Sequence, residues 1–585
     1  MTAIARYLPW AKTSEPGPAA APPAPPAPAG YEDVDLAIVA ESTYPYLRGG
    51  VSAVIQDIVC ANPDRSIGII HIAWDSNCPD EPAYPVPPQV RWVYPVYLSM
   101  NDHVDDFKLS SAADLGLSPA QRTQLAHDVF DMLESLASGD VAPFWRLYDR
   151  TLNPRTREFP LWPLLGTQEF MTAALDRCAD IGLPFTELFW LLREYFSLAC
   201  AVAGPDYPRA KIYHSHTTGY AGLLAAIGAR QNDGKVLLTE HNLYTRDTIN
   251  ELLDRNMNTV VTARDWRSDT TADVTARCWM AWYIEIGRII YAAADHITYL
   301  YPAAIGEAEG LGSQSSKSEI VPNGTLLTKF QAARDRFTER RNEIRQAAAK
   351  PKWRLAYCAR LVPIKGLVDL ISSVAELVAS GETHFQLDVM GHADEIPEYA
   401  NECYELARKL KLEDYVTFCG NVNMAEVIGD FDMLILPSYN EGQPMVVLEA
   451  MAVGLPVIGT PVGGMEQLIL SALDEGPGSV PGPCGLLVKP GDVTALADAI
   501  RNMMQDQEQY HYFSENSRNR VAQYFELERA MGAYRVIYSH LEGQAGQPAA
   551  RDDRQLPMRP EIPQQRRRLL LRATGRTSVT TGSGA

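Results

Sequence analysis

The sequence predicts an α/β protein of two doubly wound domains, each a parallel sheet with helices on both faces. Three observations predict this class. Short apolar runs alternate with longer helical patterns through most of the chain. The runs are apolar at successive positions, which is typical of strands buried on both faces. They fall into two series separated by a charged stretch, and a chain of 585 residues is too long for a single core.

Seven expected strands form the first series. They are Leu36–Ala40, Ile67–Ile72, Arg91–Tyr94, Lys211–His214, Val236–Thr239, His296–Tyr299 and Ile320–Val321. Between the third and the fourth, from about residue 101 to 203, the pattern is mostly helical and carries aromatic clusters. We interpret this stretch as a helical insertion in the first domain. A cover over a site and a partner surface both fit it.

Six expected strands form the second series. They are Arg354–Ala359, Gln386–Met390, Val416–Phe418, Met433–Leu436, Pro456–Gly459 and Gly485–Val488. The predicted organisation is an N-terminal domain over 32–328, a linker over 329–350, a C-terminal domain over 351–522 and a final helix over 523–543. The Pro/Ala-rich residues 1–31 and the basic tail 544–585 cannot bury a core, so we expect disordered arms there.

Charge and composition exclude several classes of protein. A formal net charge of −20 opposes general affinity for nucleic acid, because a phosphate backbone repels such a surface. The 9 cysteines are scattered without a C-x-x-C pair, which is typical of reduced thiols in a cytoplasmic protein. No membrane span or signal peptide is expected. The Arg566–Arg568 patch could meet an anionic membrane or an acidic partner, although a solvated tail is the simpler interpretation.

Ligand sites in open parallel sheets lie outside the carboxyl ends of the strands, so the residues after each strand decide the chemistry. After the first strand, Gly49 and Gly50 stand at a strand-to-helix turn. Two glycines there let backbone N–H groups approach an anion at a helix start. A lone Gly-Gly pair is more simply explained as a tight turn. Only the motifs that follow in the second domain make an anion site at these glycines the better interpretation.

Two cations follow the first strand of the second domain. Arg360 and Lys365 are five residues apart, straddling the strand end and the expected start of a helix. Both can point at one diphosphate and stabilise the charge on a departing nucleoside diphosphate. An isolated pair of this kind is more simply explained as surface cations on a loop.

The strongest local signal is the segment SYNEGQPMVVLEAMA, which follows an expected strand. Glu441 lies in its loop, and Glu449 lies about a turn and a half inside the next helix. A glutamate among such apolar residues is costly to bury unless it is paired or binds a ligand. The hydroxyls of a ribose would satisfy Glu449, although a capping or structural role also fits. After Pro444, the free N–H groups of Met445 and Val446 would face a phosphate.

Histidines follow two strands of the first domain. His241 comes just past one strand end, and His214 and His216 follow the preceding strand. A single histidine is more often a hydrogen-bonded structural residue than a catalytic one. His241 is favoured because it would face the cleft from the domain opposite the cations, and His216 is second. The Asp33–Asp35 pair resembles a metal-binding D-x-D but stands at the amino end of a strand, so no metal site is assigned.

Together these motifs resemble a known family. The pattern E-G-x-P-x-x-x-L-E at Glu441–Glu449, with R-x-x-x-x-K at Arg360–Lys365, is similar to the retaining GT-B glycosyltransferases of family 4. Within that family, further segments resemble the PelF-type enzymes of Pel exopolysaccharide systems. These segments are Thr43–Ser52, Thr218–Leu224, Thr239–Arg246, Val321–Gly324 and Gly391–Tyr399. The likeness covers about residues 33–541.

The resemblance implies a GT-B fold of two facing Rossmann-like domains, with the nucleotide-sugar donor bound mainly by the second. It implies that Arg360 and Lys365 bind the donor diphosphate. Glu449 would take the ribose hydroxyls, and Glu441 would lie near the sugar hydroxyls. The helix near Phe525–Leu541 would cross back to the first domain.

The resemblance also implies roles in the first domain. His241 would contact the transferred sugar, and Gly49 and Gly50 would form the loop facing the donor phosphate and the acceptor. The donor would be a UDP-sugar, with UDP-glucose the leading choice, and no metal or other cofactor would be used. A carbohydrate would be the acceptor. The expected location is cytoplasmic or peripheral at the inner membrane, with an inner-membrane polysaccharide synthase complex as a partner.

Two departures from the pattern concern the acceptor rather than the donor chemistry. Asn242 stands where a glycine is expected, and Met465–Leu468 varies the usual segment. Two alternatives stay open: a GT-B transferase that makes a glycolipid or a small glycoside, and a non-catalytic nucleotide-sugar-binding scaffold of a membrane synthase. A dinucleotide-dependent dehydrogenase is a poor third, because no G-x-G-x-x-G follows the first strand.

Overall fold

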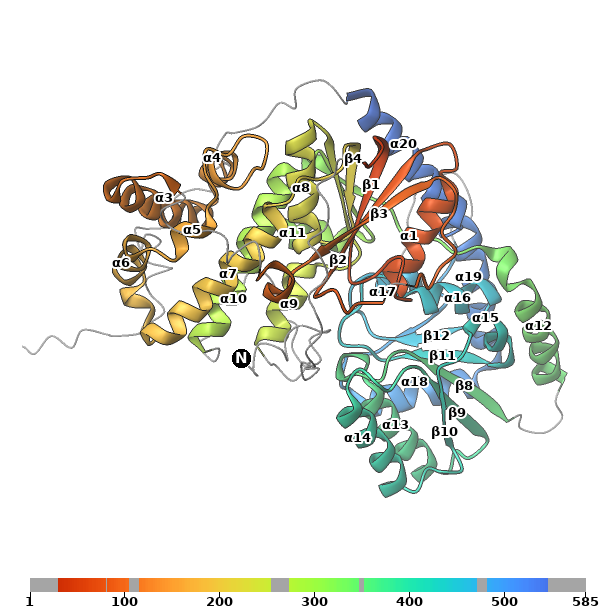
Figure 1. Ribbon diagram of the computed structural model, residues 1–585. Coiled ribbons are helices and arrows are strands. Elements are labelled where there is room, and N and C mark those ends of the chain that lie inside the picture. The colour runs from red at the N-terminus through yellow and green to blue at the C-terminus, as the bar shows by residue number, and fades with distance from the viewer. Residues whose placement is uncertain are drawn as a thin grey trace, which may run out of the picture.

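The computed structural model describes residues 30–79, 81–104, 115–253, 273–346, 352–470 and 481–544. Within these residues the strands form two parallel sheets, one of seven strands and one of six. Figure 1 shows each sheet in a domain of its own, with helices on both faces. The predicted fold class, two Rossmann-like α/β domains, is confirmed. The predicted arms over 1–31 and 544–585 lie outside the described residues, apart from Gly30, Tyr31 and Gln544.

The N-terminal sheet has the order β3-β2-β1-β4-β5-β6-β7. Its strands are β1 (Val34–Glu41), β2 (Ile67–Ala73), β3 (Val90–Tyr97), β4 (Ala210–Ser215), β5 (Lys235–Glu240), β6 (His296–Tyr299) and β7 (Ser318–Ile320). The order reverses between β1 and β4. In such sheets the crevice for ligands lies at this reversal, outside the carboxyl ends of the strands.

The edge strand β3 is longer than the sequence predicts. The expected strand Arg91–Tyr94 stops before Pro95, whereas β3 continues to Tyr97. A proline removes one ladder hydrogen bond, and this is tolerated where one side of the strand has no neighbour. β3 pairs only with β2, with His71 opposite Pro95, so the proline costs the sheet little.

The C-terminal sheet has the order β10-β9-β8-β11-β12-β13 and reverses between β8 and β11. Its strands are β8 (Trp353–Cys358), β9 (Phe385–Met390), β10 (Val416–Gly420), β11 (Met433–Leu436), β12 (Val457–Gly459) and β13 (Gly485–Leu487). All pairs are parallel, from β8 beside β9 to β12 beside β13. The loops that follow β8 and β11 therefore meet at the reversal.

Helices cover both sheets. Those of the N-terminal domain are α1 (Gly50–Ala61), α8 (Tyr220–Asn232), α9 (Tyr244–Leu252), α10 (Val274–Ala293) and α11 (Pro302–Leu311). Those of the C-terminal domain are α13 (Leu367–Ala379), α14 (Pro397–Lys409), α15 (Met424–Val427), α16 (Met445–Val453), α17 (Met465–Ile469), α18 (Val493–Gln505) and α19 (Gln507–Tyr524). Short 3₁₀ helices are η2 (Met100–His103), η4 (Ala179–Ile181), η6 (Ser315–Lys317), η7 (Leu327–Phe330), η8 (Pro363–Lys365) and η9 (Ile428–Asp430).

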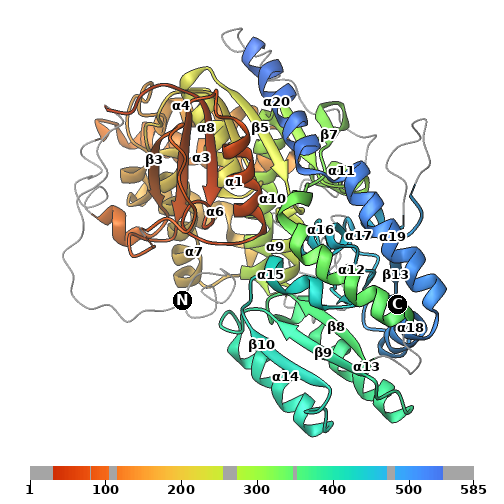
Figure 2. The ribbon, with the colours of Figure 1, turned by 90° about the vertical axis from the view of Figure 1, so that its right-hand side faces the viewer.

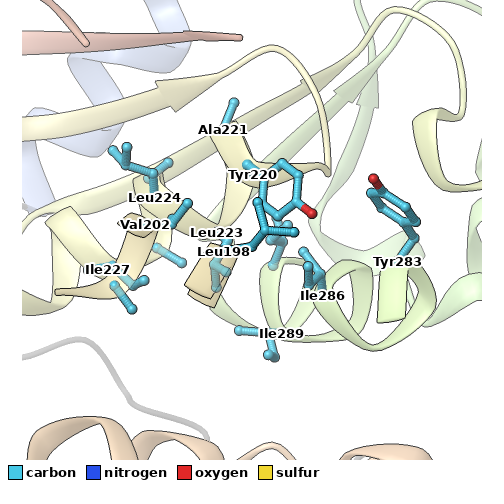
Figure 3. Close-up of a cluster of buried hydrophobic side chains, with 14 of the residues drawn as sticks. Leu198, Val202, Tyr220, Ala221, Leu223, Leu224, Ile227, Tyr283, Ile286 and Ile289 are labelled. Atoms are coloured by element: carbon cyan, nitrogen blue, oxygen red, sulfur yellow. The ribbon is translucent and has the colours of Figure 1, made fainter. Parts of the chain in front are cut away.

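The helical insertion between β3 and β4 consists of η2, η4 and five α-helices. These are α3 (Pro119–Ser138), α4 (Ala142–Thr151), α5 (Trp162–Leu165), α6 (Gln168–Arg177) and α7 (Phe185–Ala203). Figure 3 shows how the insertion is anchored: Leu198 and Val202 of α7 lie among apolar side chains of α8 and α10, including Leu223 and Ile286. Figure 1 shows α3, α4 and α6 at the end of this domain remote from the C-terminal domain.

Two helices tie the halves of the chain together. α12 (Gln331–Gln346), in the predicted linker, buries Phe337 in the core of the C-terminal domain. α20 (Leu527–Gln544) buries Tyr534 and Tyr538 against β1 and α1 of the N-terminal domain. Figure 2 shows α19 beside the C-terminal domain and α20 continuing along the N-terminal one. The last helix thus crosses back between the domains.

Candidate functional site

The helix starts that follow β1 and β11 face each other across the domain boundary. α1 begins at Gly50 and α16 at Met445. A methyl group built on Gly50 would lie 4.0 Å from Cγ of Met445, and one built on Gly49 would meet open space. The first N–H groups of each helix lack partners within the helix. Two positive helix ends from two domains therefore converge where an anion can be bound.

The loop between β11 and α16 touches the N-terminal domain at His241. A methyl group on Gly442 would overlap the backbone carbonyl oxygen of His241. The residue before α17 also holds this loop, because Gly464 donates its N–H to the carbonyl of Gly442 at 2.7 Å. The backbone of the second domain thus lies directly on the residue that follows β5.

This close approach gives a testable prediction. Gly442→Ala should destabilise the closed arrangement by about 1–3 kcal/mol, because the added methyl group meets backbone that cannot rotate away. Small-angle X-ray scattering should show a larger radius of gyration than for the wild type. Gly306→Ala in α11 is the matched control, since a methyl group there meets nothing within 4 Å. An unchanged radius for Gly442→Ala would contradict the close contact.

Lys365 and Glu441 form the centre of the site. Nζ of Lys365 lies 2.7 Å from Oε1 of Glu441, and Ser438 donates its hydroxyl to the same oxygen at 2.7 Å. The side chain of Glu441 is 7% exposed and that of Lys365 is 16% exposed. Gly366, with φ of 67°, lets the chain turn here, because a side chain would overlap the carbonyl of Pro437. The predicted cation and the predicted acid therefore meet in a largely buried ion pair.

Arg360 is not part of this pair. Its NH1 donates to both carboxylate oxygens of Glu395 at 2.6 Å, and its side chain is 54% exposed. An exposed pair of this kind contributes little to stability. Arg360 can leave Glu395 for a diphosphate at small cost, but the structure does not bring it into contact with Lys365.

Glu449 lies on the fifth residue of α16, with Pro444 at the position before the helix. Burial raises the pKa of its carboxyl group, and the charge of Lys329 lowers it in part. No described residue donates a hydrogen bond to this carboxylate. Its oxygens are available to a ligand, while Met445 and Val446 occupy the first turn of the same helix.

Three histidines stack behind the loop. Nδ1 of His216 lies 2.8 Å from Nε2 of His241, with ring centroids 5.1 Å apart. The ring of His214 packs against that of His216, with ring centroids 4.2 Å apart and the ring planes tilted by 36°. Burial lowers the pKa of His241 to about 4 and that of His214 to about 3, and it lowers the pKa of His216 well below its usual value. All three rings are therefore neutral near pH 7.

The sequence does not predict the polar clamp that joins the domains beside this site. Asn440 of the β11–α16 loop accepts from Arg246 at 3.0 Å and donates to Asp247 at 2.8 Å, and both partners are on α9. Asn242 also donates to Asn440, at 3.2 Å. Asn440 and Arg246 stand inside motifs quoted above, but their contact joins residues 194 positions apart.

Two buried carboxyl groups at strand ends were also missed. Burial raises the pKa of Glu41, the last residue of β1, and of Glu240, the last residue of β5, to about 7. Glu41 accepts from the N–H of Ala221 at the start of α8 at 3.1 Å. Tyr291 donates its hydroxyl to Glu240 at 2.8 Å. The signal in the sequence was an acid ending an otherwise apolar strand.

Within the six described ranges, no group of three or more His, Cys, Asp or Glu side chains is placed to hold a metal ion. No helix in the same ranges is both long and apolar enough to cross a membrane.

The chain is similar to known families in both halves. Residues 34–316 match a family described as a domain of unknown function (DUF3492), and residues 339–520 match the family described as glycosyl transferases group 1. The C-terminal domain is therefore similar to the group 1 glycosyltransferases. The match runs from within α12 to within α19, and so includes Lys365, Glu441 and Glu449.

Curated relatives match over about a third of the chain. The N-acetyl-α-D-glucosaminyl L-malate synthase of Bacillus anthracis is 31% identical over 185 residues, which is 32% of this chain and 44% of that protein. The D-inositol 3-phosphate glycosyltransferase of Kineococcus radiotolerans is 30% identical over 203 residues, which is 33% of this chain and 45% of that protein. The chain thus spans less than half the length of these relatives.

Solved structures match over both domains. The sucrose-phosphate synthase of Thermosynechococcus elongatus covers 87% of this chain and 99% of its own, with 18% identity and a TM-score of 0.53. The Anabaena protein HepE, solved in complex with UDP, covers 86% of this chain and 100% of its own, with 13% identity and a TM-score of 0.52. At these identities the likeness shows the fold, which is GT-B.

Proposed function

We propose that the protein is a retaining glycosyltransferase that moves a sugar from a UDP-sugar, with UDP-glucose the leading choice, without a metal ion. The observation that carries the proposal is the meeting of Lys365 and Glu441 with the start of α16, directly against His241 of the other domain. A nucleotide-sugar has a diphosphate, a ribose and a hexose. The loops and the helix start after β8, β11 and β5 carry a cation, helix N–H groups, a carboxylate with no donor among the described residues and a neutral imidazole.

The donor diphosphate would lie between the starts of α1 and α16. Lys365 and the free N–H groups there stabilise the negative charge that grows on the departing diphosphate. Arg360 adds a second cation once it leaves Glu395. For this binding, Lys365 must contact both Glu441 and the phosphate. Its ammonium group has three N–H groups, so it can keep the 2.7 Å ion pair with Glu441 while it donates to the phosphate.

The nucleoside and the sugar would be held by the two glutamates. The carboxylate of Glu449 accepts from the ribose hydroxyls, since no described side chain occupies its oxygens. Glu441 keeps one oxygen on Lys365 and Ser438 and offers the other to a sugar hydroxyl. His241 reaches the sugar from the N-terminal domain. We infer a front-face displacement, in which the acceptor hydroxyl attacks the face that UDP leaves.

The comparisons support a sugar-nucleotide reaction at this site. The curated relatives are named as an N-acetyl-α-D-glucosaminyl L-malate synthase and a D-inositol 3-phosphate glycosyltransferase, and HepE was solved with UDP. The role in exopolysaccharide synthesis, the PelF-type assignment and the cytoplasmic location beside an inner-membrane synthase complex are proposals that rest on the motifs of the sequence. A carbohydrate acceptor is part of the same proposal.

The proposal is tested by binding and by turnover. UDP and UDP-glucose should raise the melting temperature, because a ligand at 100 times its Kd stabilises the folded state by about 2.7 kcal/mol. GDP and ADP should raise it less. Hydrolysis or transfer from UDP-glucose should persist in EDTA. Binding without any turnover on a panel of acceptors would favour a nucleotide-sugar-binding scaffold, and no binding of any nucleotide-sugar would overturn the proposal.

Glu449→Gln should weaken UDP binding by about tenfold, which corresponds to about 1.4 kcal/mol for a charge-assisted hydrogen bond made neutral. The amide keeps the shape of the side chain, so the melting temperature without ligand should not fall. Isothermal titration with UDP measures the effect. Glu466→Gln serves as the control for a neutralised glutamate at an exposed position, on α17, and an equal loss in both variants would count against the ribose role.

A further inference from the structure

A single proton lies between Nδ1 of His216 and Nε2 of His241. Nδ1 of His216 and Nε2 of His241 are 2.8 Å apart, so one of these nitrogens donates and the other accepts. Burial lowers the pKa of both rings far below 7, so neither ring is an imidazolium that could donate from both nitrogens. A neutral imidazole carries its proton on one nitrogen and has a lone pair on the other. The direction of this one hydrogen bond therefore fixes the tautomer of both rings.

The surroundings of His216 determine which of the two rings donates this hydrogen bond. Its other nitrogen, Nε2, is buried and has no hydrogen-bond partner in the described part of the chain. If His241 donated, Nε2 of His216 would carry a buried N–H with no acceptor, a group that folded proteins rarely leave unpaired. If His216 donates from Nδ1, its Nε2 is a bare lone pair, which avoids the unpaired donor.

We propose that His216 is a positioning residue that donates to Nε2 of His241 and so holds the proton of His241 on Nδ1, the nitrogen available to the ligand. Among the described residues Nδ1 of His241 has no hydrogen-bond partner, and it is not one of the atoms shut off from solvent. The role rests on the proposed function, because it gives His241 a ligand to face. The assignment of the tautomer does not depend on it.

The consequence is chemical. With its proton on Nδ1, His241 is a hydrogen-bond donor toward the crevice and cannot accept a proton there. It can hold a hydroxyl oxygen of the sugar, or an oxygen of the leaving phosphate as its charge grows. The ring cannot act as the base for the acceptor hydroxyl at this nitrogen.

His216 is itself held by the helix that crosses back between the domains. His214 stacks on His216, and its Nδ1 lies 2.9 Å from the hydroxyl of Tyr538 on α20. The other nitrogen of His214 lies 2.8 Å from the hydroxyl of Thr239 on β5. Both nitrogens of His214 are thus occupied, so this ring cannot turn to supply the missing partner of His216.

¹⁵N NMR of the wild-type protein determines the tautomer of His241 directly. In a neutral imidazole the protonated and the bare nitrogen have well separated ¹⁵N chemical shifts. The full chain, labelled at its 11 histidines, should show His241 with a protonated Nδ1 and a bare Nε2, assigned by the signals lost in His241→Gln. The reverse pattern, a protonated Nε2 on His241, would overturn the proposal.

Variants then test the effect on turnover. His216→Leu removes the donor, and we expect kcat to fall about tenfold, less than the 10²–10³-fold cost of deleting a charge-stabilising donor outright. His216→Asn places an amide N–H where Nδ1 was, and it should restore most of kcat together with the wild-type ¹⁵N pattern. Tyr538→Phe is the control for loosened packing, and it should leave the pattern of His241 unchanged.

The outcomes separate this inference from the proposed function. If the wild type shows the Nδ1–H pattern but no turnover on any nucleotide-sugar, the tautomer stands and the proposed function fails. If turnover is present and His216→Leu matches the wild type in both kcat and ¹⁵N pattern, the positioning role fails and the proposed function stands. Failure of His216→Asn to recover either readout would also count against the donor role.

Discussion

Replacing Lys365 with alanine is expected to lower kcat by about 100-fold or more. Its ammonium group contacts Glu441 in the loop before α16, where the diphosphate would lie, and removing one preorganised charge-stabilising group costs this much in comparable sites. Steady-state rates with UDP-glucose measure the effect. Lys409→Ala, at the exposed end of α14, is the matched control and should keep wild-type turnover.

The loss must be separated from misfolding. Lys365→Ala leaves the carboxylate of Glu441 buried with only Ser438 as a donor, and an unpaired buried charge is destabilising. The double variant Lys365→Ala with Glu441→Gln removes that charge as well. It should recover much of the melting temperature but none of the turnover. A kcat for Lys365→Ala within threefold of the wild type would contradict the assigned role.

Arg246→Ala is expected to lower the free energy of unfolding by about 3–5 kcal/mol, the usual cost of breaking a buried ion pair from one side. The side chain of Arg246 is 5% exposed. It donates to Glu307 at 2.8 Å, to Asp247 at 3.0 Å and to Asn440 of the other domain at 3.0 Å. Burial by itself lowers the pKa of Arg246, but the carboxylates of Asp247 and Glu307 outweigh this effect, so the pKa is raised above its ordinary value.

Urea unfolding followed by intrinsic fluorescence measures this loss. Arg408→Ala is the control, because Arg408 pairs with Glu405 on the surface of α14, at 67% exposure, and such pairs are worth little. Arg246 also donates to Oδ1 of Asn242 at 2.7 Å. Arg246→Lys should not rescue the protein, since a single ammonium cannot serve these four acceptor residues in the geometry of a guanidinium fork. A cost below about 1 kcal/mol for Arg246→Ala would show that the clamp contributes little.

The fold could be read from the sequence because its strands are local patterns. The run Met433–Leu436 is β11 residue for residue, and Leu36–Ala40 lies inside β1. Strands buried on both faces need continuous apolar residues, and this requirement is visible without any knowledge of the neighbours. The ends were less predictable. β3 passes through Pro95 because it lies at the sheet edge, and position in a sheet is not a local property.

The candidate site could be read only as separate parts. Glu441 and Glu449 belong to one motif, but the ion pair of Glu441 with Lys365 spans 76 residues. Arg360 and Lys365 were predicted to act together, whereas Glu395 holds Arg360 aside in the structure. Nothing in a linear pattern says which acid a cation will meet, because the partner is chosen by how two loops after different strands approach each other.

Local patterns were enough to predict the two parallel sheets, the division between them near residue 329 and the residue types at the strand ends, since each follows from apolar runs and turn residues close together in the chain. How the two domains meet is visible only in the folded molecule. The contact of Gly442 with His241 and the clamp on Asn440 join groups of different domains. The hydrogen bond between His216 and His241 joins residues that follow two neighbouring strands of one sheet. Their energies depend on distances of a few ångströms and on exclusion of water, which local patterns do not encode.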